Sequence, residues 1–382
     1  MKQLILFFLF SILSSCLFSQ TVSTLVPVNV GDDMHFAADG YIYSSHYGGN
    51  HFRKINPSTG EVDTILTIND NTIGAIEMDA DLNIYTCSYD FGWVGKFNAG
   101  DNSITNITTG LSGPAGIVHD SAGNLFVATN QNHSIIKIYP NGTKETWLLG
   151  TPLFWPTGIT IDNSDNLYVS NMFSGQIIRI TPDKQATVLT TLPAIADQVP
   201  DVAYLIWSNE RLFVCHFGNH VIYEVNPENG DSEIIAGTGA AGNMDGPALS
   251  ATFQNPTGIV ASPTGDTLFV TDGAAPNQLL RMIVLNTVSG QKEINALGFV
   301  LNQLFPNPVY DQLILDFSLE QPTRFSFQIT DVSGKVHSFQ KEKMFQAGQH
   351  KLDFELKELP SGQFILTVQA ENFLRSFSFL KT

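Results

Sequence analysis

Two histidines, an aspartate and an asparagine recur at one repeated position of this 382-residue chain. Together, these residue types could bind a metal ion or perform acid–base chemistry. The position lies three residues beyond an aromatic residue that closes an apolar run, and its six occupants are His46, Ser88, Thr129, Asn171, His216 and Asp272. We expect them to form a ligand-binding ring around the mouth of a channel. The alternative is that they cap strand ends through local hydrogen bonds.

The repeat that carries this position predicts the fold. The aromatic residues are Tyr43, Tyr85, Phe126, Tyr168, Phe213 and Phe269, spaced 42, 41, 42, 45 and 56 residues apart. Within each copy, β-branched and aromatic runs alternate with Gly and Asn turns, which predicts four short strands. About 42 residues with four strands is the size of a β-propeller blade. The sequence therefore predicts an all-β fold with a six-bladed β-propeller over residues 20–289.

The two ends of this repeat region complement each other. Residues 20–30 precede the first blade and match the fourth strands of other blades, whereas no fourth strand follows Leu279 to Leu285. We predict that Val22 to Val28 docks beside that last strand, because this closes the ring and removes two exposed strand edges.

The blades resemble the NHL repeat family. The resemblance rests on the Pro-x-Gly starts at 114–116, 156–158 and 256–258, the Asn-His pairs at 50–51, 132–133 and 219–220, and the glycine-rich stretch 236–259. One functional interpretation of such a propeller is a non-catalytic binding module, a rigid disc whose rim loops bind an extracellular protein, peptide or glycan. Tyr47, Phe91, Phe173 and Phe217 follow ring positions and would offer aromatic contact area.

An enzyme is the alternative that six-bladed relatives of the regucalcin and gluconolactonase type imply. Such relatives hold a divalent cation such as Ca²⁺ through a Glu, several Asn and an Asp. Asp32 or Asp33 would replace the Glu here and Asp201 the Asp, while Ala115, Thr157 and Thr257 stand at the Asn positions. These leave too few oxygen ligands for Ca²⁺. A lyase using His46, His119 or His216 is a further possibility without a supporting motif. We therefore expect a binding module without a cofactor and keep a metal-dependent lactonase as the alternative.

The C-terminal part has a different character. After a connector at 290–303, residues 304–382 are rich in Phe and alternate in polarity, which predicts a small β-sandwich. Its motifs contain Pro306, Asn307, Pro308, Asp331, Gly334, Lys335, Gly348 and Gly362. Their order and spacing resemble the C-terminal sorting domain of the type IX secretion system, which implies recognition by this Gram-negative export machinery. Each motif residue would also serve a turn or a strand edge.

The N-terminal segment also indicates export. Residues 1–19 hold one charge, Lys2, before a short apolar run, which is typical of a signal peptide. Cys16 sits in a lipobox-like Leu-Ser-Ser-Cys and leaves a lipoprotein as an alternative. No other apolar stretch approaches 18 residues. We expect a secreted or outer-membrane surface protein that is monomeric and has no transmembrane segment.

Charge and cysteine usage restrict the partners further. Residues 20–290 carry 26 Asp and Glu against nine Lys and Arg, a net charge of −17. Nucleic acid needs a cationic surface and is excluded as a partner. Cys87 and Cys215 follow their aromatic residues by two positions in blades on opposite sides of the ring. We expect two free, buried thiols, because a disulfide needs Cα atoms within about 7 Å.

Overall fold

A computed structural model describes residues 20–381 apart from 28–29, 71, 102, 196–199, 274–277, 286–298, 306–308, 320, 332–334 and 371–372. Residues 1–19, with the expected signal peptide and Cys16, lie outside the described residues. So do Pro306, Asn307, Pro308 and Gly334 of the expected sorting signals. Within the described part, no helix has the length and apolar character needed to cross a membrane.

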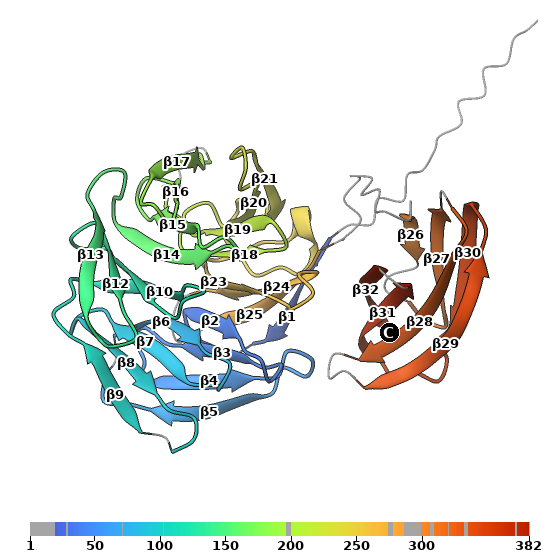
Figure 1. Ribbon diagram of the computed structural model, residues 1–382, viewed down its shortest axis with the longest axis horizontal. Helices are drawn as coiled ribbons and strands as arrows, with labels where there is room; N and C mark the ends of the chain where they lie inside the picture. The colour runs from blue at the N-terminus through green and yellow to red at the C-terminus, as the bar shows by residue number, and fades with distance from the viewer. Residues whose placement is uncertain are drawn as a thin grey trace, which may run out of the picture.

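Six antiparallel sheets surround a central axis (Figure 1). The first strand of each blade contacts the first strands of both neighbouring blades and is therefore innermost. Blade one contains β2 (Asp33–Phe36), β3 (Ile42–Ser45), β4 (His51–Ile55) and β5 (Val62–Thr67). Blade two contains β6 (Ile73–Met78), β7 (Ile84–Ser88), β8 (Trp93–Phe97) and β9 (Ile104–Thr108). Blade three contains β10 (Pro114–His119), β11 (Leu125–Thr129), β12 (Ser134–Ile138) and β13 (Lys144–Leu149).

The next two blades continue in the same order. They are β14 (Pro156–Ile161), β15 (Leu167–Asn171), β16 (Gln176–Ile180) and β17 (Ala186–Thr191); and β18 (Leu205–Ser208), β19 (Arg211–His216), β20 (Val221–Val225) and β21 (Ser232–Ala236). All six repeated aromatic residues lie on second strands. The predicted six-bladed propeller is confirmed.

Blade six is completed by the N-terminal strand, as predicted. Its own strands are β23 (Pro256–Ala261), β24 (Thr267–Asp272) and β25 (Leu279–Val284). β1 (Thr21–Val26) pairs antiparallel with β25, with Val22 opposite Ile283. The short β22 (Gly246–Pro247) pairs with the outer edge of β1, and a 3₁₀ turn, η1 (Ala248–Ser250), follows it. The ring is therefore closed by residues far apart in the sequence.

A fully buried arginine holds this closure together. Arg281 donates to Asp272 Oδ2 at 3.0 Å and to Asp245 Oδ1 at 2.8 Å. Asp245 in turn accepts the backbone N–H of Thr24 in β1 at 2.9 Å. Because the guanidinium also donates to the carbonyl oxygens of Met244 and Thr252, it ties the glycine-rich loop of blade six to its strands.

The turn and strand-start residues that recur between blades are explained by local geometry. In blade three, Asp120 Oδ1 accepts the backbone N–H of Asn124 at 2.8 Å and Asp120 Oδ2 accepts the Asn124 side chain at 2.7 Å. Where the inner strands crowd the axis, a Cβ at Gly258 would lie 2.1 Å from the carbonyl oxygen of Asp32. Only Gly permits this approach, so the Pro-x-Gly start is needed for packing.

The two cysteines are free and buried, as expected. Cys87 Sγ lies 3.3 Å from the carbonyl oxygen of Pro114. Burial raises the pKa of the Cys87 thiol to about 12 and raises that of Cys215 as well. Both thiols are therefore protonated and unreactive at neutral pH.

The C-terminal domain consists of two sheets around one aromatic core. One sheet contains β26 (Val300–Phe305), β27 (Gln312–Leu319) and β30 (Gly348–Glu355); the other contains β29 (Val336–Phe345), β28 (Thr323–Asp331), β31 (Gly362–Ala370) and β32 (Phe373–Lys381). Phe317, Phe325, Phe327, Phe364 and Phe379 are fully buried in a shared core. The small β-sandwich is confirmed. Its first strand begins at Val300, so residues 300–303 of the expected connector belong to a sheet.

Candidate functional site

The six ring residues are buried at the ends of the second strands. His46 is 5% exposed and the other five are inaccessible. Four of these positions pair directly with the first residue of the innermost strand of their own blade, as Thr129 does with Pro114 and Asn171 with Pro156. The ring residues therefore mark one end of the innermost strands.

Most ring side chains are engaged in bonds within the fold. Asn171 Oδ1 accepts the backbone N–H of Phe154 at 3.0 Å, and its Nδ2 donates to the carbonyl oxygen of Pro152 at 2.8 Å. Asp272 Oδ1 accepts the N–H groups of Gln254 and Asn255, in addition to the bond from Arg281 to Oδ2. Thr129 and Ser88 bond to neighbouring hydroxyl groups. These contacts favour the capping interpretation of the ring.

The two ring histidines are neutral at physiological pH. Burial lowers the pKa of His216 to about 4, and its Nδ1 accepts the backbone N–H of Asn219 at 3.2 Å. The pKa of His46 is lowered to about 4 by burial and by His51 and Arg53 nearby. Each histidine thus has its own surroundings, His46 in blade one and His216 in blade five.

The calcium set implied by gluconolactonase-type relatives does not fit the residues present. Both Asp32 oxygens already accept hydrogen bonds, from Gln278 Nε2 at 2.6 Å and from the backbone N–H of Tyr47 at 2.8 Å. Asp201, the other candidate ligand, has a pKa raised by burial. Among the described residues, no group of three or more His, Cys, Asp or Glu side chains could hold a metal ion.

The rim aromatics are only partly available for contact. Tyr47, Phe91 and Phe173 are exposed, as expected. Phe217 instead packs against the core shared by blades five and six. Phe173 also meets Trp155 edge to face, with ring centroids 5.4 Å apart.

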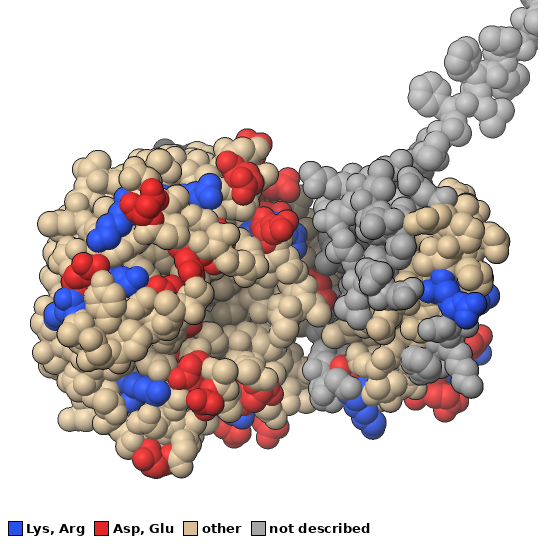
Figure 2. Space-filling model, in the orientation of Figure 1, with Lys and Arg blue, Asp and Glu red and all other residues tan. Residues whose placement is uncertain are grey.

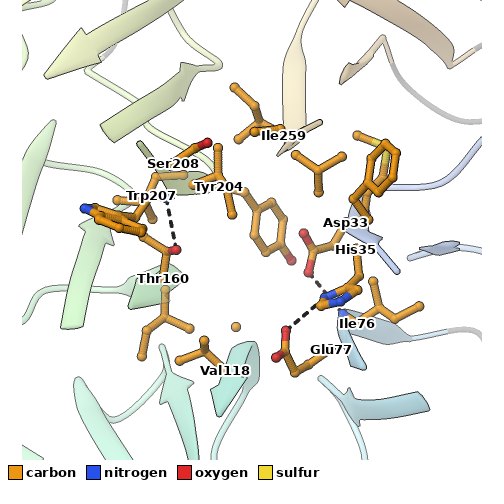
Figure 3. A pocket seen from close by; sticks show the side chains of 18 of the residues that line it. Asp33, His35, Ile76, Glu77, Val118, Thr160, Tyr204, Trp207, Ser208 and Ile259 are labelled. Atoms are coloured by element: carbon orange, nitrogen blue, oxygen red, sulfur yellow. Dashed lines mark hydrogen bonds and ion pairs between the residues drawn. The ribbon is translucent and has the colours of Figure 1, made fainter. Parts of the chain in front are cut away.

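A cavity of about 330 Å³ lies within the ring of innermost strands (Figure 3). Figure 2 shows the propeller hollowed at its centre, with Asp and Glu side chains on the surrounding blades. The cavity is lined by the second halves of several innermost strands, including His35, Glu77, Val118 and Thr160. It therefore lies toward the opposite end of these strands from the ring residues, none of which lines it.

Glu77 and two histidines form an ion-pair cluster at this cavity. His35 Nδ1 lies 3.1 Å from Glu77 Oε2, and His119 Nδ1 lies 3.4 Å from Glu77 Oε1. Burial alone would raise the pKa of Glu77, but the two imidazoles outweigh it and lower this pKa to about 2. Burial works to lower the pKa of His35, and Glu77 outweighs it so that the pKa rises. Glu77 is thus ionised, and the charged form of His35 is favoured.

Asp33 is the second carboxyl group of the cavity, and its environment is the opposite of that of Glu77. It is 7% exposed, and its Oδ2 accepts the backbone N–H of Ile76 at 3.0 Å. Burial, with a smaller contribution from the charge of Glu77, raises the pKa of Asp33 to about 7. One cavity therefore holds a carboxylate that is ionised at neutral pH and a carboxyl group with a pKa near 7.

Tyr204 extends across the centre of the channel (Figure 3). It belongs to blade five, and its hydroxyl donates to the carbonyl oxygen of Ala115 in blade three at 3.0 Å. Burial raises the pKa of Tyr204 well above its usual value, so the hydroxyl remains protonated. Tyr204 joins two blades across the channel and forms part of the cavity wall.

The cavity residues share a repeat position that the sequence analysis did not use. Eight residues before the repeated aromatics stand His35, Glu77, Val118, Thr160, Leu205 and Ala261, and all six line the cavity. The first four pair directly with their aromatics, whereas Ile206 and Val260 do so in blades five and six. Two of these positions hold ionisable residues where the other copies have apolar or hydroxyl side chains. Comparing the copies could therefore have identified His35 and Glu77 as candidate site residues. No such difference between copies points to Asp33 or Tyr204.

Comparison with known proteins agrees with the two-part architecture. Residues 303–377 match the family model of the secretion system C-terminal sorting domain. These residues are a type IX sorting domain. The resemblance found in the motifs is thus confirmed, and the domain indicates a secreted or outer-membrane surface protein. No match was found among curated proteins.

Solved structures similar to the propeller have diverse functions. An auxiliary nutrient binding protein from Bacteroides thetaiotaomicron is 16% identical, with a TM-score of 0.58 over 69% of this chain and 76% of that one. A gluconolactonase from Xanthomonas campestris is 14% identical, with a TM-score of 0.55 over 70% and 90%. Virginiamycin B lyase from Staphylococcus aureus is 15% identical, with a TM-score of 0.51 over 70% and 99%. At these identities the similarity shows the propeller fold alone.

Proposed function

We propose that this protein is an exported binding protein whose propeller holds a small ligand in its central cavity. The observation that carries the proposal is the preformed cavity of about 330 Å³ with two carboxyl groups of contrasting pKa. Ligand sites combine such a concave space with a few converging polar groups. The rigid ring of blades positions these groups before any ligand arrives, which limits the entropy lost on binding.

Thermal stability in the presence of defined small molecules tests this proposal. A panel of monosaccharides, amino acids, amines and lactones should contain at least one compound that raises Tm. Ala261→Trp, which enlarges a side chain of the cavity wall on β23, should abolish that rise. The matched control is Ala122→Trp on an exposed turn of blade three. If no compound stabilises the protein, or if Ala261→Trp leaves every shift intact, the cavity is not the binding site.

An acid–base enzyme is the second candidate, and one observation favours it. Two carboxyl groups whose environments push their pKa values apart can divide the roles of acid and base. Asp33 and Glu77 meet that description, with pKa values of about 7 and about 2. Lactone hydrolysis with a pH dependence centred near 7, lost in Asp33→Asn, would support this enzyme. A wild-type rate equal to that of buffer would reject it.

We also propose that the C-terminal domain is an export address that does not contribute to ligand binding. A chain ending at residue 299, before β26, should remain in the periplasm with its ligand binding intact. The full-length chain should reach the cell surface or the medium. Cell fractionation and protease accessibility measure both outcomes, and surface delivery of the shortened chain would refute the address. Residues 1–19 are proposed as the signal peptide for the preceding step.

A further inference from the structure

Acidic groups outnumber basic groups in the lining of the cavity. Among the described residues that line it, none is Lys or Arg, while Asp33 and Glu77 supply two carboxyl groups and His35 supplies one imidazole. The propeller around it has a net charge of −17 over residues 20–290. A recessed site within an acidic, low-dielectric body concentrates negative potential and attracts cations. An anionic ligand would meet repulsion here.

The two carboxyl groups differ in their partners. Glu77 is paired with His35 and His119 within the protein. Asp33 is almost fully buried and accepts a backbone N–H, yet among the described residues no Lys, Arg or His forms a hydrogen bond or ion pair with it. A buried carboxylate is costly unless a cation compensates it. The charge of His35 acts on Asp33 only from a distance and lowers its pKa less than burial raises it, so a direct cationic partner for Asp33 is missing among the described residues.

The surroundings of Asp33 suit an organic cation. Its carboxyl group and the Tyr204 ring both point into the cavity in Figure 3. Phe36 and Trp207 also line the cavity. Aromatic faces attract ammonium groups by about 0.5–2 kcal/mol each, depending on desolvation. A volume of about 330 Å³ suits a compact molecule rather than a polymer.

We propose that the central cavity binds a small organic cation, an amine or quaternary ammonium compound, whose charge pairs with Asp33 and lies against the aromatic wall. This rests on the proposed function and names the ligand class for the same site. Asp33 must be ionised for the pairing, so binding releases its proton. The structure thus couples occupancy of the cavity to pH.

The sign of this coupling follows from the groups that face Asp33. Cys87, Cys215 and Tyr204 have raised pKa values and stay neutral, while Glu77 stays ionised. His35 loses any charge only as pH rises, which acts in the same direction. With a pKa of about 7 for Asp33, the ionised fraction is roughly 0.1 at pH 6 and roughly 0.9 at pH 8. The apparent affinity should rise about tenfold over this range.

Isothermal titration calorimetry on the full mature chain, with three charged probes and their neutral counterparts, tests the inference. The pairs are choline and 3,3-dimethylbutanol, putrescine and 1,4-butanediol, and benzylamine and benzyl alcohol. At least one cation should bind, with its neutral counterpart tenfold weaker or worse. Its affinity should increase about tenfold from pH 6 to pH 8. Titrations at pH 7 in buffers of different ionisation enthalpy should show release of about half a proton.

Two variants separate the inference from general effects. Asp33→Asn should remove both the charge preference and the pH dependence, while Asp63→Asn, on an exposed strand of the same blade, should retain both. Equal binding of charged and neutral probes, or no binding of any cation at millimolar concentration, overturns the cation class. Neutral binding that Ala261→Trp abolishes would overturn it while leaving the proposed function standing. If the broader panel also yields no ligand, the proposed function fails as well.

Discussion

Two positions of the same repeat, eleven residues apart, have opposite relations to the fold. Three residues after the aromatic, the side chains are buried, and Asn171, Asp272 and Thr129 bond to neighbouring segments. Eight residues before it, the side chains line a cavity. Polar residues at the first position satisfy backbone groups that every blade exposes at a strand end. At the second position the side chains line the central cavity, where His35 and Glu77 pair with each other.

A similar difference separates two aspartates, one at the ring and one in the cavity wall beside the second position. Asp272 has a buried arginine as its partner, Arg281, at 3.0 Å. Asp33 has no such partner among the described residues, and its pKa is about 7. Residue type alone therefore does not identify a binding site in a repeat protein. The informative feature is a polar group whose charge the fold leaves uncompensated.

The largest expected effect on stability comes from removing β1, the strand that closes blade six. Deleting residues 20–26 removes β1, which buries Val22 and Val26 and is joined through Asp245 to Arg281. Burial of two valines is worth roughly 3–6 kcal/mol. We expect Tm to fall by about 10 °C or more. Calorimetry measures it, and an unchanged Tm would show that ring closure does not stabilise the propeller.

Breaking the buried ion pair should have the next largest effect. Arg281→Met replaces the aliphatic stem of the arginine but leaves Asp272 buried without its partner, which costs about 3–5 kcal/mol of unfolding free energy. Urea denaturation measures this loss. Asp245→Asn is the comparison, because Asp245 is 46% exposed and its pair with Arg281 is weakened by water. Equal losses in both variants would contradict the central role of the buried pair.

Asp33→Asn should change stability in the opposite direction. The folded state raises the pKa of Asp33 from 3.8 to about 7, so it binds more protons than the unfolded state between these values. Stability contributed by this group is therefore lost as pH rises from about 4 to about 7. Removing the charge should stabilise the unliganded protein by roughly 2–4 kcal/mol at pH 8 and have little effect at pH 4.

Denaturation curves at pH 4 and pH 8 measure this difference. A loss of stability at pH 8 would place Asp33 with Asp272 as an architectural residue. A gain at pH 8 together with loss of cation binding would identify a residue kept for function at the expense of stability.

Most of the fold was predictable from the sequence because it depends on local patterns. The aromatic period specified the blades, and the unpartnered segment at residues 20–30 specified the closure, since a missing strand and a surplus strand can be matched by pattern. The sorting domain followed from its motifs. Arg281 was not foreseen, because its partners Asp245 and Asp272 come together only when the glycine-rich loop folds back on blade six.

The ring predicted from the sequence and the cavity lie toward opposite ends of the innermost strands. Counting from the aromatic located a ring of polar residues but did not show which of them the fold already uses. Glu77 could have been found by comparing copies, because Val118 and Thr160 occupy its equivalent positions. The environment of Asp33 depends on the absence of a cation bonded directly to it, and the role of Tyr204 depends on the distance across the channel to Ala115. Neither quantity exists in a one-dimensional sequence.

The smallest loss of stability is expected for Ser88→Ala, a variant that directly tests the difference between the ring and the cavity. Ser88 Oγ bonds to Thr72 Oγ1 at 3.1 Å and accepts the N–H of Phe91 at 3.3 Å. Ser88→Ala should cost about 0.5–1.5 kcal/mol of unfolding free energy and leave probe binding in the cavity unchanged, because its side chain does not line the cavity. Denaturation and calorimetry on one preparation measure both. If Ser88→Ala weakened binding as much as Asp33→Asn does, the ring would contribute to ligand recognition, and the distinction between the two repeat positions would not hold.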